Sequence, residues 1–442
     1  MKMEGYYPSV KLVEDKCIGC TDCIKRCPTE AIRVRHGKAS ITNEKCIDCG
    51  LCIKVCRNNA KVATTDSLED IMNSKFSYKV AIPAPTLYSQ FRKENDINRI
   101  LTVLKSLGFD EVFEVSQGAD IVTNEILKSV NSNQFPKPMI SAACPAIVRL
   151  IQIRFPSLIP NIIKKVSPME STARMAKNYL EKKGIKRETI GVFFISPCGA
   201  KVTHIRQPQV VGKSEVDGAV SIKEIYKAMV PKMNKIKNLE ILRTSTNKGI
   251  NWAKNGGEGQ ALGIDNFISV DGIENVISIL ENMENGKLKN VDYIEALACT
   301  GGCLGGPLVV ENSFVAQNRI NKILKYSDLN DQRRVIDFDI EKIDLDWQYD
   351  LEPHSVLKLD EDLGKAIDKL NKIDEIYEKL PKIDCGSCGS PTCKSLAGDI
   401  VNNKANIEDC TFMLRQRVRE VAREMLQLSE KLPPAIGENN KI

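Results

Sequence analysis

Cysteines carry most of the chemistry that this 442-residue sequence could perform, and all sixteen fall into three groups. Eight lie between residues 17 and 56, four are spread through the centre of the chain, and four lie between residues 385 and 410. Closely spaced thiolates bind iron–sulfur clusters or zinc. Since the N-terminus shows no secretory signal, we expect a reducing cytoplasm in which these thiols bind metal and do not form disulfides.

The first eight cysteines form two consecutive runs with the spacing C-x2-C-x2-C-x3-C. This spacing is typical of bacterial two-cluster ferredoxins, in which the fourth cysteine of each run ligates the other cluster. Zinc sites instead pair two C-x2-C units through a longer spacer. We therefore predict two [4Fe-4S] clusters that carry electrons. The expected ligand sets are Cys17, Cys20, Cys23 and Cys56 for one cluster, and Cys46, Cys49, Cys52 and Cys27 for the other.

The four central cysteines are Cys144, Cys198, Cys299 and Cys303, and each lies in a segment rich in Gly or Pro. Four thiolates are the complement of one further [4Fe-4S] cluster. The glycines of LACTGGCLGGP have no Cβ, so the backbone there can lie close to a bulky inorganic group. Buried structural cysteine is the alternative, but four such residues in loops of this composition favour a cluster.

The last four cysteines, Cys385, Cys388, Cys393 and Cys410, have the spacing C-x2-C-x4-C-x16-C. We expect a third accessory [4Fe-4S] cluster here. Four-thiolate zinc sites use similar short spacings, so zinc stays open as an alternative at this site.

The pattern of strands and helices around the central cysteines predicts an α/β fold, and the chain as a whole is expected to be α+β. Short β-rich runs alternate with helical stretches. The runs are 78–82, 110–115, 138–142 and 190–195, and the helical stretches include 97–107 and 170–183. Two cysteine motifs directly follow such runs, and ligands of open α/β sheets gather at the carboxyl ends of strands. We expect an N-terminal module over 1–75, a central domain over 76–355 and a small, mainly helical module over 356–442.

Composition excludes several other classes of function. The net charge of +6 comes from 63 basic and 57 acidic residues mixed along the chain, which does not indicate a nucleic-acid-binding protein. Apolar runs are far shorter than the ~20 residues of a membrane helix. Three histidines are too few for His-rich metal sites. The small basic excess is compatible with an acidic redox partner such as a ferredoxin.

The three central segments, in this order and behind a two-cluster module, resemble the three H-cluster signatures of [FeFe]-hydrogenases. The likeness covers roughly residues 1–350 and implies two lobes of sheet and helix around a buried cofactor. It also implies that Cys144, Cys198, Cys299 and Cys303 hold a cubane. Cys303 would in addition bridge to a two-iron subcluster with CO, CN⁻ and dithiolate ligands, completing the H-cluster beside three accessory [4Fe-4S] clusters.

The same resemblance assigns roles to residues other than cysteine. Lys201 matches the lysine that pairs with a cyanide, a role that suits a compact ammonium with a full charge. Ala84, Pro85 and Thr86 match the loop that lines the other cyanide.

Three residues expected to surround the cluster differ from those usual in the family. Ser196 and Leu297 stand where methionines are usual, and Met169 stands where a glutamine normally faces the diiron site. Polarity around a cluster tunes its potential and the affinity of its open position. These three residues therefore belong to the predicted cofactor site.

Ala143 is the departure with the largest expected consequence. Active members have a cysteine at this position that shuttles protons, and a methyl group cannot relay a proton. The remaining relay positions align with Ile126, Ser129 and Ile163, with Glu125 as the nearest carboxylate. Elsewhere, we interpret His204 as a histidine without a catalytic role. The alternative is that it replaces the lost carrier, because the unperturbed pKa of histidine lies near neutrality.

Loss of a proton relay slows turnover more than it weakens H2 binding, which favours a sensory or regulatory hydrogenase with low activity. The resemblance is to the sensory type without a PAS domain, which also carries a C-terminal four-cysteine domain. Two alternatives stay open: an ordinary ferredoxin-dependent hydrogenase with another proton path, and a non-catalytic iron–sulfur assembly or binding protein without the diiron subcluster. Partners would be H2, protons, a ferredoxin-like redox protein, hydrogenase maturation proteins and an unknown signalling protein.

The region 411–430 predicts a helix with apolar residues at helical spacing. These residues are Leu414, Val418, Val421, Met425 and Leu428. Such a face packs on the parent domain or on a partner helix. A homodimer formed through this helix is one expectation.

Overall fold

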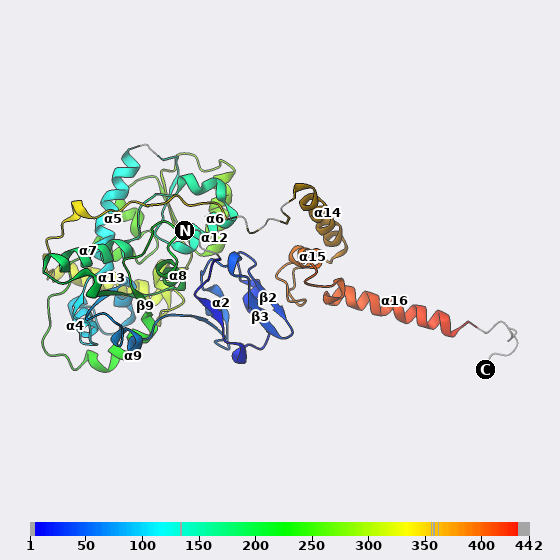
Figure 1. The fold of residues 1–442 in the computed structure, drawn as a ribbon, viewed down its shortest axis with the longest axis horizontal. Coiled ribbons are helices and arrows are strands. Elements are labelled where there is room, and N and C mark those ends of the chain that lie inside the picture. The colour runs from blue at the N-terminus through cyan, green and yellow to red at the C-terminus, as the bar shows by residue number, and fades with distance from the viewer. Residues whose placement is uncertain (1–4, 133–134, 355, 357–358, 361, 432–442) are drawn as a thin grey trace. The chain divides into compact units, whose positions relative to one another are not determined.

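The computed structural model describes residues 5–132, 135–354, 356, 359–360 and 362–431 (Figure 1). The chain divides into two compact units. One comprises residues 1–13 and 43–356, and the other comprises residues 14–42 and 357–442. The boundary between the units passes between the two N-terminal cysteine runs, so each unit contains one run.

The larger unit contains a four-stranded parallel sheet in the order β6-β5-β8-β9. Its strands are β5 (Tyr78–Pro83), β6 (Glu111–Val112), β8 (Ile190–Ser196) and β9 (Gly218–Ser221). All seven residues of β8 are buried, as expected for a parallel strand that is covered on both faces. The predicted strands over 78–82 and 190–195 are confirmed, and only two residues of 110–115 form a strand.

Alternation along these strands divides the core between the two faces of the sheet. Val192 and Phe194 of β8 belong to one hydrophobic cluster, which includes residues of α7 (Pro168–Lys182). Phe193 and Ile195 belong to another, which includes residues of α4 (Ile97–Lys105) and α9 (Ile222–Met233). Since each fully buried large apolar side chain contributes roughly 1.5–3 kcal/mol, both layers fix the sheet firmly.

A second parallel sheet in this unit has the order β10-β11-β7. Its strands are β10 (Phe267–Asp271), β11 (Tyr293–Leu297) and β7 (Met139–Ile140). The predicted run 138–142 is therefore a strand of only two residues. Two separate parallel sheets with helices around them agree with the two-lobed α/β fold expected from the sequence.

Further helices of this unit complete the two lobes, and several are labelled in Figure 1. They are α5 (Val115–Asn131), α6 (Pro145–Arg154), α8 (Gly199–Arg206), α10 (Asn247–Asn251), α11 (Gly257–Leu262), α12 (Ile273–Glu284) and α13 (Ser313–Leu329). The second cysteine run lies on α2 (Leu51–Val55) and the loop before it, next to the antiparallel pair β1 (Val10–Leu12) and β4 (Lys61–Ala63) and the short helix α3 (Leu68–Met72).

The smaller unit combines the first cysteine run with the C-terminal module. It contains α1 (Asp22–Lys25), the antiparallel hairpin of β2 (Ile32–Arg35) and β3 (Lys38–Ile41), and the helices α14 (Leu363–Lys379), α15 (Cys393–Val401) and α16 (Thr411–Ser429). Ile373, Leu380, Leu396 and Ala397 form its C-terminal core together with two of the cysteines. None of the described helices in either unit is both long and apolar enough to cross a membrane.

Candidate metal centre

The central cysteines follow the ends of three parallel strands. Cys144 comes shortly after β7 and is the N-cap of α6, and Cys198 stands two residues after the end of β8 and is the N-cap of α8. Cys299 and Cys303 lie in the glycine-rich loop after β11. Two of the four thiols therefore stand at helix N-termini, where the backbone favours a bound group of negative charge.

Three of these four thiols line one cavity, which holds about 740 Å³ of space between atoms, part of it open to solvent. Cys144, Cys198 and Cys303 lie on its wall. Burial, followed by the charges of the other three cysteines, raises the pKa of Cys299, so this thiol lies within electrostatic range of the other three. The structure therefore brings the predicted set of four cysteines together.

The donor set fits a cationic iron cluster. Burial raises the pKa of Cys198 to about 11 and that of Cys303 to about 12. Thiols with such pKa values hold their protons at neutral pH, and a bound metal removes them. Within the described residues, no three His, Cys, Asp or Glu side chains are arranged to hold a single metal ion.

Glycines in the loop that carries Cys303 are required by close backbone contacts. A Cβ on Gly306 would lie 2.3 Å from the carbonyl oxygen of Pro197, and a Cβ on Gly302, whose φ is +70°, would lie 2.8 Å from the backbone nitrogen of Asn255. Real Cβ atoms do not approach that closely. The Gly306 contact brings the Cys303 loop against the residue that precedes Cys198.

Lys201 lines the same cavity from the first turn of α8. Burial lowers the pKa of this ammonium, while the neighbouring Cys198, Cys303 and Cys144 act in the opposite direction. A positive charge held beside thiols in a partly desolvated cavity suits an anionic ligand.

Five of the six other predicted cofactor residues also line the cavity. These are Ala84, Pro85, Thr86, Met169 and Leu297. The hydroxyl of Thr86 is fully buried and has no hydrogen-bond partner among the described residues. A buried hydroxyl in this state is unusual and gives the cavity a free polar group that a bound cofactor could engage.

Ser196, the sixth, is buried and is not part of the cavity wall. Its hydroxyl donates to the carbonyl oxygen of Cys198 at 2.8 Å and accepts from the Cys198 amide at 3.2 Å. Ser196 therefore stabilises the turn that presents Cys198, which is a structural role beside the cluster site.

Ala143 lies on the cavity wall, and its methyl group offers no proton. Its amide donates to the hydroxyl of Ser141 at 3.2 Å, and that hydroxyl in turn donates to a carboxylate oxygen of Glu258 at 2.7 Å. The backbone amide of Ala143 is thus connected, through Ser141, to the carboxylate of Glu258 on another segment.

Glu258 and Glu295 are cavity residues that the sequence analysis missed. Both are almost fully buried. Glu258 also accepts from the hydroxyl of Tyr293 at 2.6 Å, and Glu295 accepts from the amides of Gly256 and Gly259 at 3.0 and 2.9 Å. Burial raises the pKa of both carboxyl groups well above their usual range, toward neutrality. Such groups can exchange protons at the pH of a cell.

A signal for Glu295 was present in the sequence. It stands inside the apolar run YIEAL, which forms the central strand of the second sheet, and all five of its residues are buried. An acidic residue in such a strand is rarely buried without a function. Glu258 has no comparable local signal, because it follows a short glycine-rich turn.

The relay positions aligned in the sequence are not part of the cavity wall. Ile126 and Ile163 are buried in a separate hydrophobic cluster. The hydroxyl of Ser129 donates to the backbone of its own helix, and Glu125 pairs with Lys128 and Lys165. None of these four residues lines the cavity.

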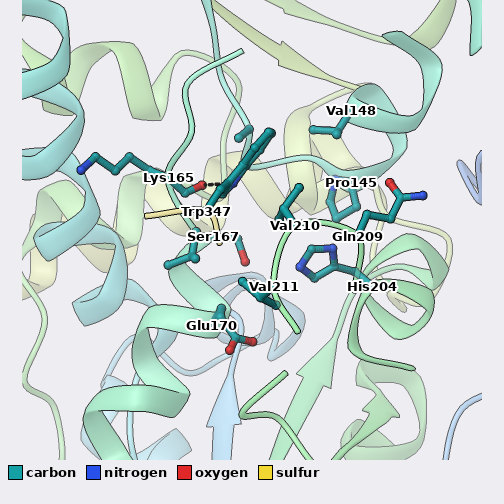
Figure 2. A pocket seen from close by; sticks show the side chains of 12 residues that line it. Pro145, Val148, Lys165, Ser167, Glu170, His204, Gln209, Val210, Val211 and Trp347 are labelled. Atoms are coloured by element: carbon teal, nitrogen blue, oxygen red, sulfur yellow. Dashed lines mark hydrogen bonds between the residues drawn. The ribbon is translucent and has the colours of Figure 1, made fainter. Parts of the chain in front are cut away.

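His204 lines a neighbouring pocket of about 470 Å³, part of it open to solvent. Figure 2 shows its ring in this pocket together with the Glu170 carboxylate, the Ser167 side chain and the Trp347 indole, whose N–H donates to the Lys165 backbone at 2.9 Å. Burial and then the charge of Lys201 lower the pKa of His204 to about 3. His204 is therefore neutral near pH 7, which disfavours it as a proton carrier and favours the interpretation of a histidine without a catalytic role.

The second cysteine run is attached to the elements that form the cavity. Asp48, buried between Cys46 and Cys49, accepts from the hydroxyl of Thr203 on α8 at 2.6 Å and from the amide of Val10 at 3.0 Å. Lys54 on α2 donates to the carbonyl oxygen of Gly305 at 3.0 Å. These contacts hold the second run against the helix that Cys198 begins and against the loop that carries Cys303.

In the smaller unit, the C-terminal cysteines surround a pocket of about 280 Å³, part of it open to solvent. Its lining includes Cys385, Cys388, Cys393 and Cys410. Two of the predicted ligands, Cys393 and Cys410, are buried in the core of this module. The pocket collects all four thiols that the sequence predicted to share one metal centre.

The hairpin of β2 and β3, which follows the first cysteine run, is hydrogen-bonded to the segment that carries Cys388. The amide of Val34 donates to Gly389 at 2.8 Å, and the guanidinium of Arg35 donates to the carbonyl oxygen of Cys388 at 2.7 Å. Asp399 forms ion pairs with both Arg33 and Arg35, at 2.7 and 3.1 Å. The two expected ferredoxin ligand sets stay predictions.

Three family models match the chain. The C-terminal domain of the iron-only hydrogenase large subunit matches residues 77–264 and 229–307, together just over half of the chain. A 4Fe-4S dicluster domain matches residues 9–57, and an Fe-S cluster family matches residues 380–412.

Individual relatives are distant. The chain is 23% identical to iron hydrogenase 1 of Clostridium pasteurianum over 299 residues, which cover 54% of this chain and 51% of that protein. It is 26% identical to the periplasmic [Fe] hydrogenase large subunit of Nitratidesulfovibrio vulgaris, covering 49% and 56%. A structure of [FeFe]-hydrogenase HydA1 from Chlamydomonas reinhardtii aligns with 65% of this chain and 98% of that chain, at 16% identity and a TM-score of 0.48. The chain thus spans only about half the length of these curated relatives.

Proposed function

The chain belongs to the iron-only hydrogenase family, and on that premise we propose that it binds H2 and interconverts it slowly with protons and electrons, as a sensor of H2. This proposal rests on one observation. Three cysteine thiols, Lys201 and two carboxyl groups of raised pKa line the same cavity.

The proposed cofactor is an H-cluster in that cavity, beside three accessory [4Fe-4S] clusters. Cys144, Cys198, Cys299 and Cys303 would hold its cubane, and Cys303 would also bridge to the two-iron subcluster. When bound, this group supplies a redox-active iron with an open position for H2. Lys201 would hold an anionic ligand of the subcluster by its charge, and the Thr86 hydroxyl is a second polar group available to that ligand shell.

Protons in this proposal move through Glu258 and Glu295. Ala143 has no group that could carry a proton at this position. Glu258 on α11 has a raised pKa and lines the same cavity. Its contacts to Ser141 and Tyr293 fix the carboxyl group in one orientation. A ferredoxin-like protein would supply or accept the electrons, maturation proteins would install the subcluster, and a separate protein would receive the signal.

Infrared spectroscopy of the matured chain tests this function. We expect bands from CO and CN⁻ after maturation, and a shift of those bands under H2, because an open iron near Lys201 would bind the gas. Chain produced without maturation proteins is the control and should give no such bands. Absence of the bands from a matured, iron-replete sample would remove the hydrogenase proposal and leave an electron carrier.

A second candidate is an ordinary hydrogenase, in which the path through the two buried carboxyl groups would sustain fast turnover without the thiol. Ala143→Cys separates the two functions. If the missing thiol limits turnover, the variant should raise H2 evolution by ~10²-fold or more, measured with reduced methyl viologen against Ala143→Ser as the control. An unchanged rate, together with high activity of the parent chain, would favour the ordinary hydrogenase and its alternative path.

A further inference from the structure

α16 is unlike the other long helices, because none of its residues is buried. Five of its exposed apolar residues, Leu414, Val418, Val421, Met425 and Leu428, are 45, 59, 38, 66 and 64% exposed and lie along one side of the helix, while Phe412 and Leu426 lie outside this stripe. Soluble chains seldom leave such a continuous apolar stripe in water. We therefore expect a partner to cover this stripe, because the described part of the chain does not.

The spacing of the stripe indicates which kind of partner it fits. The five residues follow one another at intervals of four, three, four and three residues, which is the repeat of a coiled-coil seam. A helix that packs on a globular core normally carries a wider apolar face. The partner is therefore expected to be another helix with the same repeat, and a second copy of α16 has it.

Charges beside the seam select the direction of pairing. Arg417 and Glu424 occupy the same flanking position in successive repeats. In a parallel pair of copies, these two residues would face Ala422 and Ser429 and find no opposite charge. In an antiparallel pair, Arg417 would face Glu424 of the second copy, and the twofold symmetry would form this ion pair twice.

We propose that two copies of this chain associate through antiparallel α16 helices. The register that opposes Arg417 to Glu424 also stacks Leu414 on Met425 and Val418 on Val421 of the second copy, so the charges and the apolar layers agree. In the single chain, Arg417 makes only an exposed 3.6 Å pair with Glu420 on its own helix. This association goes beyond the hydrogen chemistry and does not depend on it.

Charge reversal in the complete chain tests the association. Sedimentation velocity under anaerobic conditions should show a dimer for the parent chain. Arg417→Glu and Glu424→Arg should each weaken the dimer by at least tenfold, because each creates two like-charge contacts, and the double variant should restore it. Arg423→Glu, on the outer side of the same helix, is the matched control and should leave the dimer intact.

Other outcomes overturn the proposal. A parent chain that stays monomeric at all concentrations would assign the stripe to a different protein. A dimer that survives both single reversals would be parallel or formed elsewhere, and a double variant as weak as the single ones would exclude the proposed register. Iron content and the helical circular dichroism signal of each variant show that it is folded.

Discussion

Glu258→Gln is expected to lower the rate of H2 evolution by ~10²–10⁴-fold, the contribution typical of a well-placed general acid. The amide keeps the size of the side chain and can still accept a hydrogen bond from Ser141 or Tyr293. It cannot release a proton at the pH of the assay. The viologen-linked rate of matured protein measures the effect, and the infrared bands of CO and CN⁻ should persist.

The dependence on pH provides a second readout of the same variant. Burial raises the pKa of Glu258 above that of an ordinary carboxyl group, so the folded protein keeps the acid form at pH values where a free glutamate has lost it. H2 evolution should fall as pH rises through this raised pKa, and the fall should be absent in Glu258→Gln. The exposed Glu188→Gln variant serves as control. A parental rate and pH profile in Glu258→Gln would show that the proton takes another route.

Cys303→Ala is expected to abolish H2 conversion and the CO and CN⁻ bands together, because it removes the thiol proposed to join the cubane to the diiron subcluster. The accessory clusters depend on cysteines elsewhere, so their electron paramagnetic resonance signals should remain in the reduced protein. Combining the two spectroscopies on one sample separates loss of the subcluster from loss of the fold.

Thr300→Ala is the matched control for that substitution. Thr300 lies on the same loop and is exposed, and its replacement leaves the glycine contacts around Cys303 unchanged. The control should keep both the bands and the activity. Retention of CO and CN⁻ bands in Cys303→Ala would mean that another residue bridges to the subcluster.

Much of the fold could be predicted from the sequence because strongly periodic signals determine it. The apolar run that forms β8 is buried on both faces, and a run of this kind admits few interpretations. The central cysteines were recognisable because glycines and prolines flank them and because they follow predicted strands. β7 and β11 are parallel neighbours, so the cysteines that follow them leave the same edge of one sheet. Cys198 follows β8 of the other sheet, so its place in the same cavity depends on how the two lobes pack.

The acidic residues of the cavity were not predictable in the same way. Glu258 and Glu295 come from separate segments, and only the packing of α11 against β11 brings them to one wall. The raised pKa of each depends on burial, which no local pattern encodes. The lowered pKa of His204 likewise depends on burial and on Lys201, and neither could be inferred from the residues beside it in the sequence.

The contacts of Asp399 with Arg33 and Arg35 have a consequence for how this protein can be dissected. Deleting the chain from residue 380 onward would leave two guanidinium groups without their carboxylate and would free the Val34 amide that now bonds to Gly389. The N-terminal segment should therefore not behave as an autonomous ferredoxin when it is expressed alone. Residues 14–42 and the C-terminal module belong to one compact unit, so a shortened form would have to keep both or lose both.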